Sequence, residues 1–160
     1  MFCSKSNDWK ELVFLLEYID HMQRFRKEYY RALEPVCRKW ELTHNEADVV
    51  LFLRNHPGLD RASEIVARRG IAKSHVSQSV AALESRGFLC RTPDPADRRT
   101  EHLRLTEAAA PMADEAAAVQ QAFFSALLDS LTPEDRENWT RIAAKLCAAI
   151  EQMEQSGKEA

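Results

Sequence analysis

The side chains in this sequence best suited to specific chemistry are the cations of one short turn. Residues 94–99 read Asp-Pro-Ala-Asp-Arg-Arg, so turn-forming residues precede two adjacent guanidinium groups, those of Arg98 and Arg99. An arginine at the tip of a turn suits a narrow minor groove of DNA, where the electrostatic potential is most negative. Asp97 is close enough in sequence to hold one of these arginines by a charge-assisted hydrogen bond. A hairpin whose charges are simply solvated is the alternative interpretation.

A second polar group lies upstream, on a segment expected to form a helix from Ala72 to Arg86. Its outward side carries side chains of modest size: Lys73, Ser74, His75, Ser77 and Gln78. On a helix that enters the major groove, glutamine can make a two-point contact to adenine, and serine can donate or accept. Lysine, serine and the amides of a helix N-terminus also suit phosphate oxygens, which set the register without selecting sequence. An exposed helix face without a ligand has the same composition.

Two short helices and a hairpin must position these side chains. One apolar stripe lies opposite the polar side of the second helix: Val76, Val80 and Leu83. Asp60 is expected to cap the preceding short helix, which Gly70 ends. Gly87 stops the second helix, and strands are expected at 88–92 and 100–105, with the basic turn between them. This order of helix, turn, helix, strand, basic turn and strand is that of a winged helix-turn-helix.

Helical segments are expected before this core. Two apolar stripes run along residues 8–33, which is more than a small domain alone covers, so a second chain is expected to cover one of them. Pro35 is expected to break that helix and to leave a short helix at residues 36–40. Thr43 and Glu46 have the spacing of a capping box, which predicts the start of the next helix.

Two further helices are expected after the hairpin. An alanine-rich segment opens at Thr106, and its regular helix begins near Pro111 after a looser turn. Thr132 and Pro133 open the last helix. Its apolar residues recur at helical spacing: Trp139, Ile142, Leu146, Ile150 and Met153. The fold class expected is therefore mostly α-helical, with a small β-hairpin.

Charge is distributed unevenly along the chain. The 160 residues carry a net charge of −3, with 45% hydrophobic and 29% charged residues. Between Arg61 and Arg104, nine basic side chains outnumber five acidic ones, which gives this block +4 and leaves −7 for the remainder. A basic block within an acidic chain suits a local contact with a polyanion. A solvated surface of mixed sign is the alternative, since +4 is modest.

The sequence offers little support for catalysis, cofactors, metals or membrane insertion. The four glycines build no phosphate-binding loop, and neither GxSxG nor HExxH occurs, so we expect no enzyme and no cofactor. His21, Cys37 and His44 match no standard zinc spacing, so no metal is expected. No apolar run approaches the roughly 20 residues that span a bilayer, and no signal peptide is evident. We therefore expect a cytoplasmic protein with reduced cysteines.

The segment from Leu42 to Ala109 resembles the winged-helix core of the MarR family of bacterial transcription regulators. Four features carry the resemblance: Ser74-x-x-Ser77-x-x-Val80-x-x-Leu83-Glu84-x-x-Gly87, the strand ending at Arg91, Asp94-Pro95-x-Asp97-Arg98-Arg99, and Leu103-x-Leu105-Thr106-Glu107. The flanking helices match in layout, with one long helix before the core and two after it. One departure is the run from Ala108 to Pro111, because the family usually has a glycine shortly after the Leu-Thr pair.

The resemblance implies a homodimer whose two winged lobes bind pseudo-palindromic DNA. It implies that Arg99 enters the minor groove with Asp97 as its anchor, and Arg91 joins the expected DNA contacts. It also implies three parts: a dimerisation helix and a short following helix at 1–41, the winged helix-turn-helix at 42–106, and C-terminal dimerisation helices at 107–160. The double apolar stripe of the first helix fits such a dimer independently.

Members of this family usually sense a small phenolic or lipophilic molecule, and some sense oxidants or zinc. Tyr29, Tyr30, Trp40 and His44 are candidates to line an effector pocket, and they also fit a plain core. The sequence therefore predicts a DNA-binding repressor released by a small-molecule effector. Two alternatives stay open: a winged-helix module that docks a protein without reading DNA, and a redox sensor acting through a cysteine, for which Cys3 is a candidate.

Overall fold

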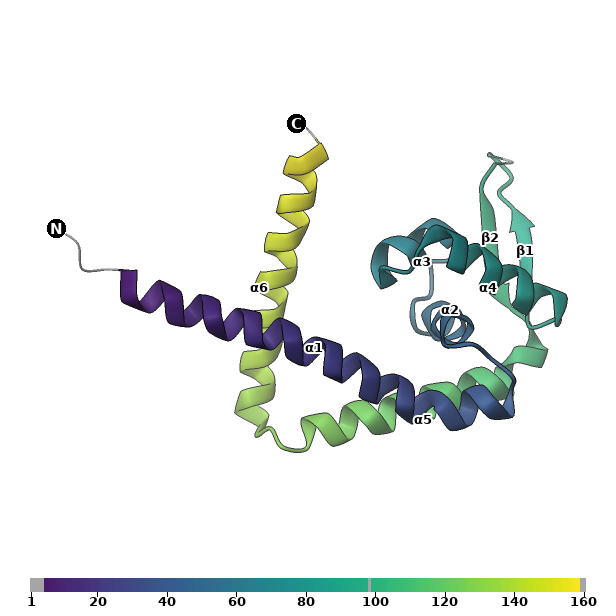
Figure 1. Cartoon of the computed structure of the whole chain (residues 1–160). Coiled ribbons are helices and arrows are strands. Elements are labelled where there is room, and N and C mark those ends of the chain that lie inside the picture. Colours follow the sequence, from purple (N-terminus) through teal and green to yellow (C-terminus); the bar gives the residue numbers. More distant parts are fainter. Residues whose placement is uncertain (1–4, 98, 159–160) are drawn as a thin grey trace. The chain divides into compact units, whose positions relative to one another are not determined.

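The computed structural model of the chain describes residues 5–97 and 99–158, with side chains mostly from residue 19 to residue 156. This part of the chain is mostly helical and contains one antiparallel hairpin (Figure 1). The elements in order are α1 Lys5–Lys39, α2 His44–Asn55, α3 Ala62–Arg69, α4 Lys73–Ser85, β1 Leu89–Pro93, β2 Glu101–Leu105, a 3₁₀ helix Glu107–Ala109, α5 Ala110–Leu128 and α6 Pro133–Lys158. The fold class expected from the sequence is confirmed.

The chain divides into two compact units, and the boundary along the sequence falls between Gln121 and Ala122. In the first unit, the three short helices and the hairpin gather near the C-terminal end of α1 (Figure 1). Its core is centred on α2, where Val49, Val50, Leu51 and Phe52 are fully buried. Apolar side chains from the surrounding elements complete this core: Leu33, Ile65, Val76, Val80, Leu83, Leu89, Leu103 and Met112.

Helix α1 does not break at Pro35, and the short separate helix expected at 36–40 is wrong. The helix runs through Pro35 to Lys39, although proline removes one backbone donor and crowds the preceding turn. Leu33, Val36 and Cys37 are buried on either side of it. Tertiary packing of this face therefore outweighs the local cost of the proline, which a reading of propensity alone does not include.

The helix boundaries around the core follow the expected caps with one exception. Thr43 and Glu46 form the capping box of α2, since the Glu46 amide donates to Thr43 Oγ1 at 3.2 Å and the Thr43 amide donates to Glu46 Oε2 at 2.8 Å. Gly70 ends α3 in the left-handed region, with φ of 63°. Asp60 is not the cap of α3, because Arg61 takes that place and its amide donates to Glu64 Oε2 at 2.9 Å.

The hairpin begins directly at the end of α4. Gly87, at φ of 74°, lets the chain reverse, and the Phe88 amide donates back to the Leu83 carbonyl at 2.9 Å. The strands pair from Leu89 opposite Leu105 to Pro93 opposite Glu101. The hairpin therefore starts from a fixed point on the helix that precedes it.

The long flanking helices carry uncovered apolar stripes. In the second unit, Thr132 caps α6, and Trp139, Ile142, Leu146, Ile150 and Met153 lie 47–72% exposed along this helix. On α1 the large exposed side chains are Val13, Leu16, Ile19 and Met22. As expected, α5 becomes regular near Pro111, after the short 3₁₀ helix. None of the described helices is both long and apolar enough to cross a membrane.

Candidate nucleic-acid interface

Helix α4 separates its two faces cleanly. Val76, Val80 and Leu83 are buried against the body, together with the small polar Ser79. The five polar side chains expected to meet DNA are all exposed: Lys73, Ser74, His75, Ser77 and Gln78. The side chain of the N-cap residue Ala72 offers no acceptor to the first amides of the helix, while its carbonyl accepts the His75 amide at 2.9 Å and the Val76 amide at 3.1 Å. This face thus combines small polar side chains with the N-terminus of a helix that has no side-chain cap.

The turn of the hairpin is organised by two aspartates. Asp94 Oδ1 accepts from the amides of Ala96 and Asp97 at 2.7 Å and 3.0 Å. Asp97 then accepts the Arg99 amide at 3.0 Å through Oδ1 and the Thr100 hydroxyl at 2.9 Å through Oδ2. The side chain of Arg99 is exposed at the end of this chain of hydrogen bonds.

Asp97 thus bonds within the turn, and among the described residues its carboxylate does not bond to the Arg99 side chain. Within the described residues its carboxylate accepts from a backbone amide and a hydroxyl, while the bond expected from the sequence was to an arginine side chain. The physical reason is that a carboxylate two residues before an amide closes a local turn that a long side chain need not enter. Arg98 lies outside the described residues, so its expected role stays a prediction.

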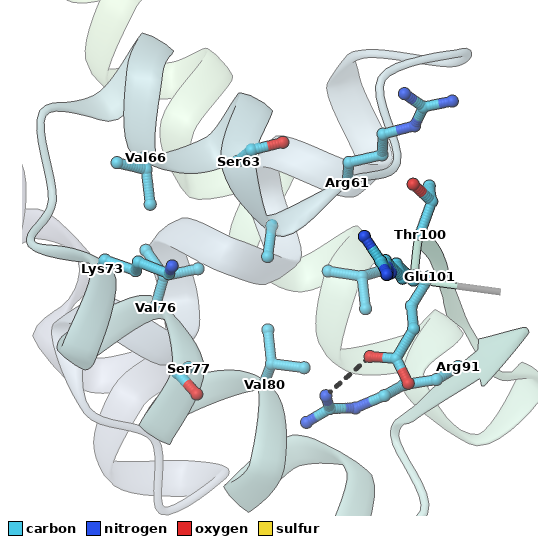
Figure 2. A pocket seen from close by; sticks show the side chains of 13 residues that line it. Arg61, Ser63, Val66, Lys73, Val76, Ser77, Val80, Arg91, Thr100 and Glu101 are labelled. Carbon is cyan, nitrogen blue, oxygen red and sulfur yellow. Dashed lines mark hydrogen bonds and ion pairs between the residues drawn. The ribbon is translucent and has the colours of Figure 1, made fainter. Parts of the chain in front are cut away.

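Arg91 is held by two carboxylates. Its Nε donates to Glu84 Oε2 on α4, and its Nη1 donates to Glu101 Oε2 on β2, each at 3.0 Å. The bond to Glu101 is drawn in Figure 2. These carboxylates, Glu101 first, raise the pKa of Arg91 above its ordinary value. The side chain therefore joins α4 to the hairpin.

Helix α4 and the hairpin with its turn, which we call the two reading elements, border one cavity of about 440 Å³. Helix α4 contributes Lys73 and Ser77, and the hairpin contributes Arg91 and Glu101 (Figure 2). Arg99, in the turn, also lines this cavity. The third wall is formed by α3 and its N-cap residue Arg61, which belongs to the basic block but was not expected at the site. Because one cavity touches both, the polar face of α4 and the arginine of the turn lie on the same side of the molecule.

His102, on β2, is a second residue near the site that was not expected from the sequence. Its ring lies between Asp60 Oδ1, at 2.7 Å from Nδ1, and Asp94 Oδ2, at 3.0 Å from Nε2. Bonds with these carboxylates, Asp60 first, raise the pKa of His102 above its ordinary value. A histidine within a predicted strand was the available signal, but nothing in the sequence indicates that Asp60, a residue from another segment, lies beside it.

Three of the four expected effector residues gather in one cluster. The Tyr30 hydroxyl donates to Asp48 Oδ2 at 2.5 Å, and its ring stacks on His44 with centroids 4.7 Å apart. Tyr29 lies against Tyr30 at 5.6 Å between centroids. Asp48 is buried, which raises its pKa, while the bond from Tyr30 works in the opposite direction.

Trp40 does not share this cluster. Its indole donates to Glu115 Oε2 at 2.9 Å and meets Phe88 edge-on at 6.3 Å. Trp40 therefore braces the end of α1 against α5 and the start of the hairpin. The cavity beside α4 is lined by none of the four residues: Tyr29 and Tyr30 lie on α1, Trp40 directly follows α1, and His44 begins α2.

The described cysteines are free thiols in different surroundings. Cys37 is buried, and burial together with nearby carboxylates raises its pKa to about 11. Cys90 and Cys147 are exposed. Cys3, the expected candidate for oxidant sensing, lies outside the described residues.

Comparison with known proteins supports the same fold. Residues 40–100 match the family model described as MarR family. The HTH-type transcriptional repressor MdtR of Bacillus subtilis (strain 168) is 30% identical over 129 residues, 81% of this chain and 80% of that protein. The crystal structure of YusO from Bacillus subtilis has a TM-score of 0.57 at 28% identity and covers 91% of this chain and 99% of its own. The S. aureus MepR–DNA complex has a TM-score of 0.67 at 17% identity, covering 82% of this chain and 97% of its own, which supports the fold alone.

Proposed function

Because the chain belongs to the MarR family and is a DNA-binding transcription regulator, we propose that it is a homodimeric repressor that a small molecule releases from a pseudo-palindromic operator. The observation that carries this proposal is that α4 and the turn of the hairpin present their polar side chains on the same side of the molecule. Lys73 and Ser77 of α4 border the same cavity as Arg99 of the hairpin. A single duplex can therefore meet the helix in its major groove and the arginine in the adjacent minor groove.

The exposed side chains divide by chemistry. Lys73 and Ser77 suit phosphate oxygens near the helix N-terminus, while Ser74, His75 and Gln78 suit base edges. Arg99 takes the minor groove, and Arg98 stays a proposed second contact of the turn. Arg91 stays a proposed contact too. It is expected to contribute less than Arg99, because two of its nitrogens already pair with carboxylates.

A second copy of this chain is the proposed cover for the exposed apolar stripes. Five large side chains of α6 are at least 47% exposed, Trp139 among them, and the described side chains of α1 include four large apolar ones that are 38–54% exposed, such as Leu16 and Ile19. Apolar surface of this kind marks an interaction site. Two lobes held in this way would meet half-sites about one helical turn apart.

The proposed effector site rests on Tyr29, Tyr30 and His44, with Asp48 behind them. Stacked rings beside a buried carboxylate suit an aromatic ligand that also donates a hydrogen bond. A redox sensor acting through Cys37 is not favoured, because the thiolate is the reactive form and burial raises the pKa of this thiol to about 11.

The test is a binding titration on a duplex selected from random sequences by the protein itself. Arg99→Ala should cost about 1–3 kcal/mol of binding free energy, whereas Gln78→Ala should change base preference at one position per half-site. Arg104→Ala, on the same hairpin but outside the proposed contacts, is the matched control for loss of charge. The affinity for this duplex should fall steeply as the salt concentration rises. A salt-independent affinity, or an Arg99→Ala variant that binds like Arg104→Ala, would favour the protein-docking module.

A further inference from the structure

His102 connects two segments that the backbone leaves far apart. Asp60, bonded to Nδ1 at 2.7 Å, lies just before α3, and Asp94, bonded to Nε2 at 3.0 Å, lies just after β1. The three side chains are 20–31% exposed, so water reaches them only in part. The Leu103 amide also donates to the Asp60 carbonyl at 2.7 Å. The ring therefore sits where the base of the turn meets the helical body.

This arrangement selects one protonation state of the ring. An ionised carboxylate only accepts hydrogen bonds, so both ring nitrogens must carry a proton to bond both aspartates. A neutral ring would place one bare nitrogen against a carboxylate oxygen. Asp94 stays ionised, because the bonds from His102 and from two backbone amides lower its pKa to about 2. The pKa of His102 itself is raised above 6.5, chiefly by Asp60 and then by Asp94.

The bond to Asp94 continues to the tip of the turn. The second oxygen of Asp94 accepts the amides of Ala96 and Asp97, and Asp97 in turn accepts the amide of Arg99. Three consecutive carboxylate bonds thus link the ring to the backbone of the residue that is proposed to enter the minor groove. If the ring releases Asp94, the first of these links loses its attachment to the body.

The charged surroundings of the ring are mixed. Arg61 follows Asp60 on the segment before α3, and Arg104 lies two residues along β2, on the same strand face by alternation. Thr92, opposite the ring on β1, is uncharged. Glu101 belongs to the opposite strand face and pairs with Arg91. The two bonded aspartates are therefore the charges that decide the state of the ring.

We propose that His102 is a positioning residue for the wing, that is, for the β1–β2 hairpin and its turn. As an imidazolium it fixes Asp94 and keeps Arg99 in reach of the minor groove. DNA affinity therefore falls as the ring loses its proton. This inference rests on the proposed function, since Arg99 must contact DNA for the effect to appear. The two bonds from the His102 ring to Asp60 and Asp94, which we call the clamp, are both present below 6.5, the ordinary pKa of histidine. They are lost as pH rises through the raised pKa of His102. Above that pKa, the dissociation constant should rise by up to about tenfold per pH unit, until it reaches that of Arg99→Ala.

The experiment is a fluorescence-anisotropy titration at constant ionic strength from about pH 6 to pH 9, the range in which a histidine of raised pKa titrates. The probe is the duplex selected by the wild-type protein. His102→Gln should bind weakly and without the wild-type pH slope. The double variant with His102→Gln and Arg99→Ala should bind DNA no more weakly than Arg99→Ala alone, because both changes remove the same contact. His75→Gln, which removes a different histidine from the reading helix, should lose affinity but keep the slope.

A second measurement needs no DNA. In the free protein, the ring nitrogens of His102 should titrate above 6.5 by NMR, and the backbone order parameter of Arg99 should fall in His102→Gln. A ring that titrates at or below its ordinary value overturns the inference. Additive losses of binding free energy in the double variant with His102→Gln and Arg99→Ala also overturn it, provided that Arg99→Ala alone weakens binding. Should no duplex be selected, or should Arg99→Ala bind like wild type, the proposed function fails, and the NMR data alone still decide whether the clamp exists.

Discussion

Arg86, at the end of α4, should be the side chain that fixes the recognition helix to the long helix α1. Its Nη1 donates to the Glu41 carbonyl at 2.8 Å, and its Nη2 donates to the Trp40 carbonyl. Its guanidinium carbon also lies 5.0 Å from the centre of the Phe88 ring. The carbonyls just after a helix lack partners within it, so a planar cation with two parallel donors satisfies both at once.

Replacement of Arg86 by alanine should lower the free energy of unfolding by about 2 kcal/mol. Each bond from this exposed cation should contribute about 0.5–1 kcal/mol, because water competes for the same groups. The contact with the ring adds about 0.5 kcal/mol at an exposed site. That sum is a sizeable part of a total stability of about 5–15 kcal/mol.

Urea unfolding followed by circular dichroism measures this loss, with Arg86→Lys as the matched control. Lysine keeps the charge but is a single point donor, so it should recover less than half of the loss. Two results would refute the reasoning. One is an alanine variant within about 0.5 kcal/mol of wild type, the range of ordinary surface substitutions. The other is full recovery by lysine, which would assign the effect to charge and not to the two-carbonyl geometry.

Two further predictions concern the body of the protein. Thr43→Ala removes the side-chain acceptor of the α2 capping box, so the free energy of unfolding should fall by about 1 kcal/mol. Thr43→Ser keeps a hydroxyl acceptor and should keep the stability of the wild type. Equal stability of the two variants in urea would show that this cap contributes nothing. Cys37 should resist alkylation by iodoacetamide while exposed Cys90 reacts, because burial raises the pKa of the Cys37 thiol to about 11. Peptide mass mapping that finds equal rates at the two thiols would contradict the burial of Cys37.

The recognition helix and the hairpin could be predicted because their signals are local. A stripe of Val76, Val80 and Leu83 specifies which side of α4 is buried, and Gly70 and Gly87 mark where helices end. Capping boxes are equally local, since the residues that close them lie three positions apart. Features of this kind require no knowledge of what the chain meets on folding.

The errors have the opposite origin. Pro35 was expected to end α1 because its local cost is plain, while the burial of Val36 and Cys37 becomes visible only in the folded chain. Asp60 was expected to cap a helix, since aspartate before a helical segment usually does. Its carboxylate is instead taken by His102, which lies 42 residues away. A contact at that separation leaves no periodic trace in a single sequence.

The same distinction bears on how the DNA-reading elements are held. The buried stripe of α4 attaches it to the core by apolar contacts, which salt and moderate pH changes leave nearly intact. The wing has a narrower apolar attachment, with Leu89 and Leu103 as its buried side chains. Ionic contacts add to this attachment: Arg91 pairs with Glu84 of α4, and His102 pairs with Asp60, whose carbonyl also accepts the Leu103 amide. Ionic strength and pH should therefore act on the position of the wing before they act on the recognition helix, which separates minor-groove affinity from major-groove sequence preference.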